Sequence, residues 1–159
     1  MRRLPLFVLT LILMAGLVPS SEALPRAIDS WYEGALGYEL AVEEARSSGK
    51  PMMIYFRTEW CGYCKQFEEK LLSSETVQSF FDVDEVVTVT INPEAGTNEA
   101  RLASAYRVEG FPAIFMHSSD QTKVHPIRRT ASTNGQVRLQ RPEEFVSTLR
   151  QAATAVESR

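Results

Sequence analysis

The chain has 159 residues, of which 44% are hydrophobic and 23% charged, and its formal net charge at pH 7 is −3. This length and composition are typical of one globular domain and exclude a disordered or repetitive chain. The sequence has no basic stripe interleaved with aromatic residues, and phosphate repels a mildly acidic domain, so nucleic acid is excluded as a partner.

The first 23 residues have the organisation of an export signal. A cationic start at Arg2 and Arg3 precedes an apolar run over residues 4–18, and small residues follow as far as Ala23. Because a secretory signal peptide shows this order, we expect cleavage near Ala23 and a periplasmic or otherwise exported location. The alternative is an uncleaved membrane anchor, but the run is shorter than the roughly 20 apolar residues that span a bilayer as a helix.

The remaining sequence is expected to form a linker over residues 24–34 and one domain over residues 35–157. Trp31 and Tyr32 are expected to anchor the linker on the domain. Hydrophobic periodicity predicts the elements of the domain. In chain order they are a helix over 37–48 that Gly49 ends, a strand over 52–56, a helix from Cys64, a strand over 86–91, a helix over 99–106, antiparallel strands over 113–117 and 123–128, and a helix from Pro142.

Apolar positions on these elements predict the core. Leu40, Ala41 and Ala45 are expected to face inward from the first helix. The other residues assigned to the core are Phe67, Leu71, Phe80, Phe81, Ile114, Phe115, Phe145, Val146 and Leu149. Residues 130–141 follow neither period, although Asn134-Gly135 is a turn signal. The expected fold class is α/β, with a central mixed sheet covered by helices on both faces.

The sequence contains two cysteines, Cys61 and Cys64, in a C-x-x-C pair. A disulfide across two intervening residues closes too small a loop to stabilise the fold much, which argues against a structural role. A closed zinc site requires four ligands, and the remaining donors, His117 and His125, lie far along the chain on predicted strands. Copper delivery would also need further soft donors near the pair. Thiol–disulfide exchange is therefore the favoured chemistry, with no metal and no bound cofactor.

The position of the pair predicts different roles for its two thiols. Cys61 follows a strand, and the helical spacing of Cys64, Phe67 and Leu71 begins directly after it. Unpaired N–H groups at the start of a helix favour negative charge, so we expect a lowered pKa for the Cys61 thiol. Cys64 lies about one turn further on and is expected to be more buried. Cys61 is therefore predicted to react with the partner, and Cys64 to resolve the mixed disulfide.

Two segments resemble the thioredoxin superfamily. The stretch from Glu59 to Lys65 looks like its active-site segment, and the stretch from Gly110 to Phe115 looks like its cis-proline loop. The resemblance covers about residues 35–157 and implies the thioredoxin fold. Within the superfamily, the chain is similar to small exported members and to the C-terminal periplasmic domain of the membrane thiol:disulfide interchange protein. Gly62-Tyr63 instead matches the motif of the periplasmic disulfide isomerase.

The resemblance implies a protein thiol–disulfide oxidoreductase that binds its partners at the cysteine pair and the proline loop. With the pair upstream, we expect a cis bond before Pro112, which leaves the Phe111 backbone free to pair with an extended partner. Trp60, Gly62 and Tyr63 complete the expected substrate-binding surface. The expected partners are exported proteins with thiols or disulfides, and we favour a reductase fed by a membrane electron donor. A disulfide oxidase or isomerase, and a non-catalytic binding module, are the alternatives.

One position departs from the family pattern. Thioredoxins resemble one another in having a buried Asp six residues before the first cysteine, which assists proton transfer to the resolving cysteine, and Tyr55 occupies that position here. A buried Tyr is a poor base at neutral pH. Either a water, Glu59 or Glu68 serves instead, or the proton transfer is less assisted in this chain.

Overall fold

The structure is a computed structural model that describes residues 28–83 and 86–158. The expected signal peptide and its cleavage position near Ala23 lie outside these ranges. The elements in chain order are β1 (Tyr32–Glu33), α1 (Gly34–Ser48), β2 (Met52–Phe56), α2 (Gly62–Phe67), η1 (Glu68–Leu72), α3 (Glu75–Asp82), β3 (Val87–Ile91), α4 (Thr97–Ala105), β4 (Ala113–His117), β5 (Val124–Pro126), β6 (Thr130–Thr133), β7 (Gln136–Leu139) and α5 (Pro142–Glu157).

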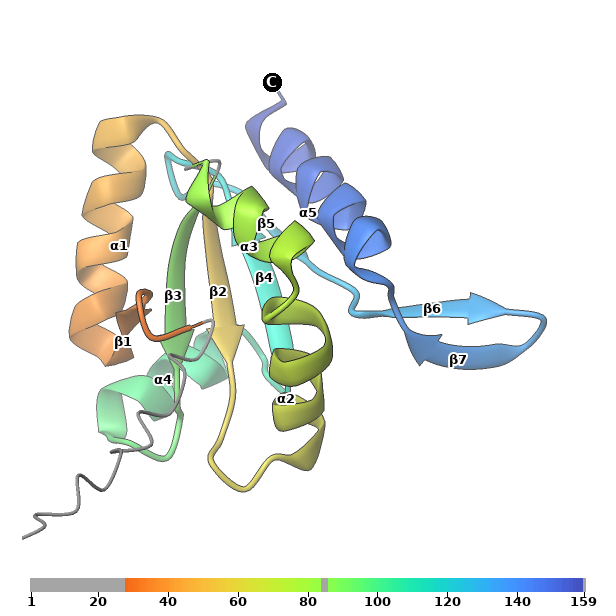
Figure 1. Cartoon of the computed structure of the whole chain (residues 1–159). Coiled ribbons are helices and arrows are strands. Elements are labelled where there is room, and N and C mark those ends of the chain that lie inside the picture. The colour runs from red at the N-terminus through yellow and green to blue at the C-terminus, as the bar shows by residue number, and fades with distance from the viewer. Residues whose placement is uncertain (1–27, 84–85, 159) are drawn as a thin grey trace, which may run out of the picture.

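The main sheet has five strands in the order β1-β3-β2-β4-β5. Strand β3 runs parallel to both β1 and β2, whereas β4 is antiparallel to β2 and β5 is antiparallel to β4. Helices cover both faces of this sheet (Figure 1). The mixed, two-sided α/β arrangement that the sequence predicts is therefore confirmed.

Strand β2 lies in the middle of the sheet and separates two halves of the core. All five of its residues are buried, because both faces of a central strand pack against helices. Met53 and Tyr55 point to the side covered by η1, α3 and α5, where Phe67, Leu71 and Phe145 pack. The alternate residues of β2 pack on the other side with α1 and α4. The strand thus ends, at Phe56, between two packed layers that hold the following loop in place.

Helix α1 buries a different set of residues from the one expected. Gly37, Ala41 and Ala45 are its buried positions, whereas Leu40 is 51% exposed, so the prediction that Leu40 faces inward is wrong. Residues four apart share one helix face, and each step of one residue turns the chain by about 100°, which rotates Leu40 away from that face. A Cβ atom at Gly37 would lie 3.1 Å from the Tyr32 backbone, so a small residue is required at this contact.

The described residues before α1, from Ile28 onward, pack on the domain, and the last two of them belong to the sheet. Tyr32 and Glu33 form β1, which pairs in parallel with Val89 and Thr90 of β3. Ile28 and Trp31 are buried, and the Trp31 ring packs edge-on against other aromatic rings of the core. A two-residue strand is too short to show an alternating pattern, which explains why the sequence predicts a linker here.

Residues 130–139, which follow neither period in the sequence, form a separate two-stranded hairpin. Strands β6 and β7 pair with each other and with no other described strand, and the hairpin projects away from the main sheet (Figure 1). Asn134 and Gly135 form its two-residue turn, with φ angles of 52° and 78°, so the turn signal is confirmed. Most of its side chains are exposed, and a strand exposed on both faces has no reason to alternate.

Candidate active site

Cys61 and Cys64 lie at the junction between β2 and α2. The loop that leaves β2 is held by two backbone hydrogen bonds, from Arg57 N to Ile91 O at 3.0 Å and from Cys61 N to Thr58 O at 3.2 Å. Cys61 is the N-cap residue of α2 and has an extended backbone. The position predicted from the sequence, where a strand has ended and a helix begins, is therefore confirmed.

A disulfide joins Cys61 to Cys64. Cys64 is fully buried and Cys61 is 4% exposed, so the order of burial is the one predicted. The backbone N–H of Cys64 donates a hydrogen bond to Cys61 Sγ at 3.0 Å. A helix-start amide aimed at this sulfur would also stabilise a thiolate there once the disulfide is reduced.

Two exposed aromatic side chains flank the disulfide. Trp60 is 67% exposed and Tyr63 is 72% exposed. Trp60 Nε1 donates a 2.8 Å hydrogen bond to Glu94 Oε1, and its ring packs edge-on against Phe111 at 6.1 Å between centroids. Gly62 faces open space, since a Cβ there would meet nothing within 4 Å. The surface beside Cys61 is therefore apolar and open. The Trp60 indole on this surface is held in one orientation by Glu94 and Phe111.

The Phe111–Pro112 peptide bond is cis. Pro112 comes directly before β4, whose first residue, Ala113, pairs with Phe56 at the end of β2. This register places the proline loop next to the segment that leads to Cys61. Arg129 Nη1 donates a 3.0 Å hydrogen bond to the Pro112 carbonyl. Arg129 is a residue that the sequence analysis does not single out.

A buried polar network lies one helical turn beyond Cys64. Tyr55 Oη donates a 2.9 Å hydrogen bond to Glu68 Oε1, and Arg57 Nε lies 2.7 Å from the same oxygen. Arg57 Nη1 also donates to Glu59 Oε1 at 2.6 Å. Burial, followed by the charge of Glu68, raises the pKa of Tyr55 far above its ordinary value. The phenol therefore stays protonated and acts as a donor at any physiological pH.

This network bears on the position where Tyr55 replaces the family's Asp. Of the two acids considered in its place, Glu68 is 9% exposed and hydrogen-bonded to Tyr55, whereas the side chain of Glu59 is 67% exposed. Glu68 N also donates to Cys64 O, so the acid follows Cys64 by one turn. Glu68 is the acid that the structure places on the buried side of the pair.

Neither histidine takes part in the site. His117 lies on β4 with its Nε2 atom 2.6 Å from the hydroxyl of Tyr106, and burial lowers the pKa of His117. His125 lies on β5, at a position paired with Met116. No group of three or more His, Cys, Asp or Glu side chains within residues 28–83 and 86–158 is arranged to hold a metal ion.

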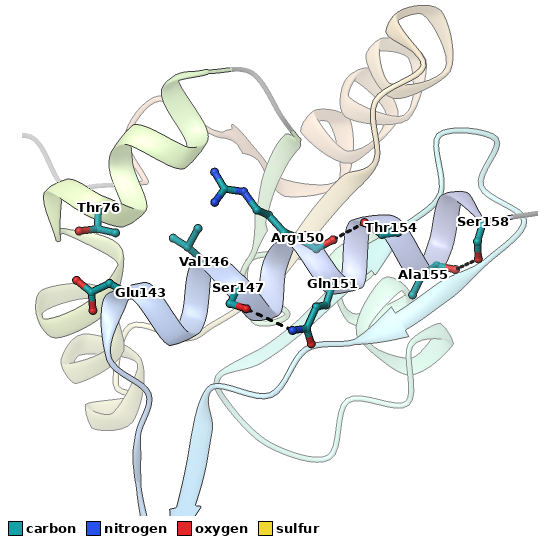
Figure 2. Close-up of a pocket in the computed structure, with 9 residues that line it drawn as sticks. All are labelled: Thr76, Glu143, Val146, Ser147, Arg150, Gln151, Thr154, Ala155 and Ser158. Atoms are coloured by element: carbon teal, nitrogen blue, oxygen red, sulfur yellow. Dashed lines mark hydrogen bonds between the residues drawn. The ribbon is translucent and has the colours of Figure 1, made fainter.

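A surface hollow lies away from the cysteines, along α5. It has a volume of about 650 Å³, and it is lined by residues of α5, by Ser158 directly after that helix and by Thr76 on α3 (Figure 2). Within it, Gln151 Nε2 donates to Ser147 Oγ at 3.3 Å, and Arg150 stacks over the Phe80 ring. Its lining combines small polar and aliphatic side chains with the charged Glu143 and Arg150, and it includes no residue of the disulfide site.

The residues that the sequence does not single out share one feature. Arg57, Glu94 and Arg129 all act through contacts with residues distant in sequence or in another loop. No motif marks them, although a charged residue directly after a buried strand, as at Arg57, is a weak signal.

Among the described helices, none has the length and hydropathy needed to span a membrane.

A sequence profile described as thioredoxin-like matches residues 30–118, which include the disulfide, the proline loop and four strands of the sheet. The chain belongs to this thioredoxin-like family. The fold is the thioredoxin fold that the resemblance implies. Structural likeness agrees with this: a thioredoxin from Thermus thermophilus matches with a TM-score of 0.56 and 22% identity over 80% of this chain and 90% of that one.

Among thioredoxin-like proteins, the thiol:disulfide interchange proteins are similar to this chain. DsbD 1 of Pseudomonas aeruginosa is 32% identical over 48% of the chain, and DsbD of Yersinia enterocolitica is 29% identical over 60% of it. The matches span only 13% and 16% of those relatives. The oxidised C-terminal domain of Neisseria meningitidis DsbD has a TM-score of 0.58 and 18% identity, covering 77% of this chain and 99% of that domain.

Proposed function

We propose that this chain is an exported thiol–disulfide oxidoreductase that reduces protein disulfides through Cys61 and Cys64. The observation that carries the proposal is the Cys64 amide, which donates to Cys61 Sγ at the start of a helix while Cys64 itself is fully buried. The Cys61 sulfur is thus prepared to be an anion next to the exposed Trp60 and Tyr63, and the Cys64 sulfur is fully buried.

The reaction transfers two electrons and two protons from the Cys61–Cys64 dithiol to the partner's disulfide. The Cys61 thiolate attacks one sulfur of the partner's disulfide, which forms a mixed disulfide and releases the partner's first thiolate. Cys64, as its thiolate, then attacks Cys61 Sγ and displaces the partner's second thiolate. The products are a reduced partner and the Cys61–Cys64 disulfide seen in the structure. A dithiol donor returns the chain to its reduced form, and we propose a membrane electron donor for this step.

The partner is expected to bind across the proline loop. The Phe111 ring packs against the exposed Trp60, so the loop lies beside that surface, and an extended segment of the partner is proposed to pair with the Phe111 backbone there. Trp60, Gly62 and Tyr63 supply an open contact area, and the half-buried Phe111, which packs against Trp60, extends it; Pro112 is buried and acts by shaping the loop.

Glu68 is proposed to assist the second step. The Cys64 thiol has to lose its proton before it can attack, and it is buried away from water. Glu68 is buried one helical turn after Cys64, and Tyr55 and Arg57 contact one of its oxygens. Tyr55 does not serve as the base, because its raised pKa keeps the phenol protonated and a protonated phenol does not take up the thiol proton.

The first experiment traps partners. Substituting Cys64→Ala should leave the mixed disulfide with Cys61 unresolved, so partner proteins from the exported compartment should remain covalently attached. Cys61→Ala, with Cys64 intact but buried, is the matched control and should trap almost none. If neither variant traps any protein, the chain is a binding module whose cysteines are incidental.

The second experiment sets the direction of electron flow. Equilibrating the pair with glutathione gives its reduction potential. A value near about −270 mV, as in thioredoxin, supports a reductase, and a value near about −120 mV, as in DsbA, supports an oxidase.

Fractionating cells that express the full chain tests the export signal, since a cytoplasmic, unprocessed product would contradict it.

A further inference from the structure

Positive charge is concentrated in one stretch of an acidic chain. Residues 121–142 contain five Lys or Arg and no Asp or Glu, although the whole chain has a formal net charge of −3. The five cations are Lys123, Arg128, Arg129, Arg138 and Arg141. Four of them lie on the β6–β7 hairpin and its two ends. We call residues 128–141 the basic arm.

The basic arm offers unpaired strand edges. Strands β6 and β7 are bonded to each other through the register Thr130↔Leu139 to Thr133↔Gln136, and neither pairs with the main sheet. Each outer edge therefore presents backbone N–H and C=O groups that an additional strand can use. Val137 on β7 is 73% exposed, so the arm also has an apolar contact to offer.

The basic arm is joined to the proline loop by Arg129. Strands β4 and β5 pair Phe115 with Pro126, and Ile127 N donates to Ile114 O at 2.8 Å. Continuing this register places Arg129 opposite Pro112. The chain leaves the sheet before that point, and the Arg129 guanidinium supplies the bond to the Pro112 carbonyl instead, at 3.0 Å. The arm therefore begins beside the loop that is proposed to bind the partner.

The other end of the arm is fixed as well. Arg138 donates two hydrogen bonds of 2.7 Å to the Glu144 carboxylate, and Arg141 Nε lies 3.7 Å from the same group. Arg128 differs from these two: it is exposed and forms no ion pair within the part of the chain that the structure describes. The arm is thus a held structure that leaves a positive charge available for a partner.

We propose that the basic arm is a docking surface for an acidic, extended segment of the protein whose disulfide reacts at Cys61. This rests on the proposed function. The open edges fit an extended segment, the exposed Arg128 fits an acidic side chain, and the Arg129 bond makes the arm continuous with the proline loop. Charge complementarity of this kind raises the rate of encounter and fixes the orientation of the partner.

The test uses two synthetic disulfide peptides of equal length and the full chain. In both, the disulfide has the same flanking residues, and a tail of Glu and Asp residues in one is replaced by Ser and Gly residues in the other. The readout is the ratio of kcat/KM for the acidic peptide to kcat/KM for the neutral peptide. For the wild-type protein, we expect a preference of about tenfold that disappears between about 20 mM and about 300 mM salt.

The variant Arg128→Glu should abolish or invert this preference, mainly through KM for the acidic peptide. Arg46→Glu, in the last turn of α1, makes the same change of charge at the opposite end of the fold and should keep the wild-type ratio. Arg128→Gln, which removes the charge without reversing it, provides a second variant. Thermal unfolding of each variant checks that the fold is retained.

Three outcomes overturn the proposal. An equal ratio in the wild type and both Arg128 variants means that the arm does not dock acidic segments, while reduction of the neutral peptide still supports the proposed function. If the wild type reduces neither peptide, the proposed function fails with it. Arg128-dependent binding to vesicles of anionic lipid, with no discrimination between the peptides, would assign the arm to a membrane surface instead.

Discussion

The hydroxyl of Tyr55 donates a 2.9 Å hydrogen bond to the carboxylate of Glu68, which lies one helical turn beyond Cys64. Arg57 approaches the same carboxylate oxygen at 2.7 Å, so one buried acid receives a neutral donor and a cation together. A thioredoxin-like site in which Tyr55 replaces an acid thus retains a buried negative charge, supplied from the helix rather than from the strand.

Glu68→Gln tests whether that charge assists Cys64. If Glu68 accepts the Cys64 proton, the amide should slow resolution of the mixed disulfide by about a hundredfold, because general base catalysis by one group is typically of this size. Attack by Cys61 should change much less, since it does not require that proton. Stopped-flow measurement of the two steps with a protein disulfide separates them.

Glu69→Gln is the matched control for this experiment. Glu69 is the next residue on the same helical segment and is exposed, so the same chemical change there should leave both steps unchanged. Equal rates of resolution in the wild type and Glu68→Gln would mean that a water, not Glu68, takes the proton.

Tyr55→Phe isolates the phenol. The variant keeps the ring, which is fully buried against Trp31 and Phe67, and removes only the hydrogen bond to Glu68. We expect a loss of about 1.5–3 kcal/mol in the free energy of unfolding, the usual effect of deleting one buried hydrogen bond to a charged group. Denaturant unfolding measures it. A variant as stable as the wild type would show that Arg57 alone satisfies the carboxylate.

Local sequence was sufficient for the reaction centre. The cysteine pair, the helix that starts at it and the buried strand before it are all encoded within residues 52–71, where periodicity and motif agree. The missed contacts depend on register instead. Arg129 meets the Pro112 carbonyl only because β4 and β5 pair in one alignment, and the sequence of neither strand specifies that alignment by itself.

The segments that the sequence does not predict as strands are all short. Strand β1 contains two residues, and β6 and β7 contain four each, so each is too brief for alternation to identify it, although Gln136 to Leu139 does alternate. The prediction that Leu40 faces inward is wrong for a different reason. Its helix packs closely through Gly37, Ala41 and Ala45, and a stripe of small residues leaves the larger neighbour outside.

The ion pair between Arg138 and Glu144 predicts a pH-dependent stability. Hydrogen bonds from Arg138, then from the Arg141 amide, lower the pKa of Glu144 from 4.5 to about 2. Because the folded pKa lies below the unfolded one, the stabilisation is fully present above about pH 4.5 and is lost as pH falls toward about 2. The melting temperature of the wild type should therefore exceed that of Glu144→Gln at neutral pH and converge with it in this window.

Glu143→Gln provides the comparison for that experiment. Glu143 is also in the first turn of α5 but is exposed, and the structure gives it no ion pair with a described residue. Its melting curve should follow the wild type more closely across the same pH range. A constant difference between wild type and Glu144→Gln at all pH values would show that the loss is one of shape and not of charge.

Trp60 is expected to serve partner binding rather than the chemistry of the sulfurs. Trp60→Ala removes an exposed ring that Glu94 and Phe111 hold beside the disulfide. We expect KM for a protein disulfide to rise about tenfold, since a single aromatic anchor at an interface is commonly worth more than 1 kcal/mol. The reaction with a small aromatic disulfide should change little. An equal loss for both substrates would mean that Trp60 positions Cys61 itself.

The bond between Arg129 and the Pro112 carbonyl gives the last prediction. In Arg129→Met the side chain keeps its apolar stem, but the carbonyl loses its donor, so the proline loop should be held less firmly. KM for protein disulfides should then rise severalfold, while the reduction potential of the Cys61–Cys64 pair stays at the wild-type value. Arg129→Lys retains one donor and should recover part of the affinity. A changed potential would instead mean that the guanidinium acts on the sulfurs through its charge, and Arg129→Lys would then restore the potential rather than KM.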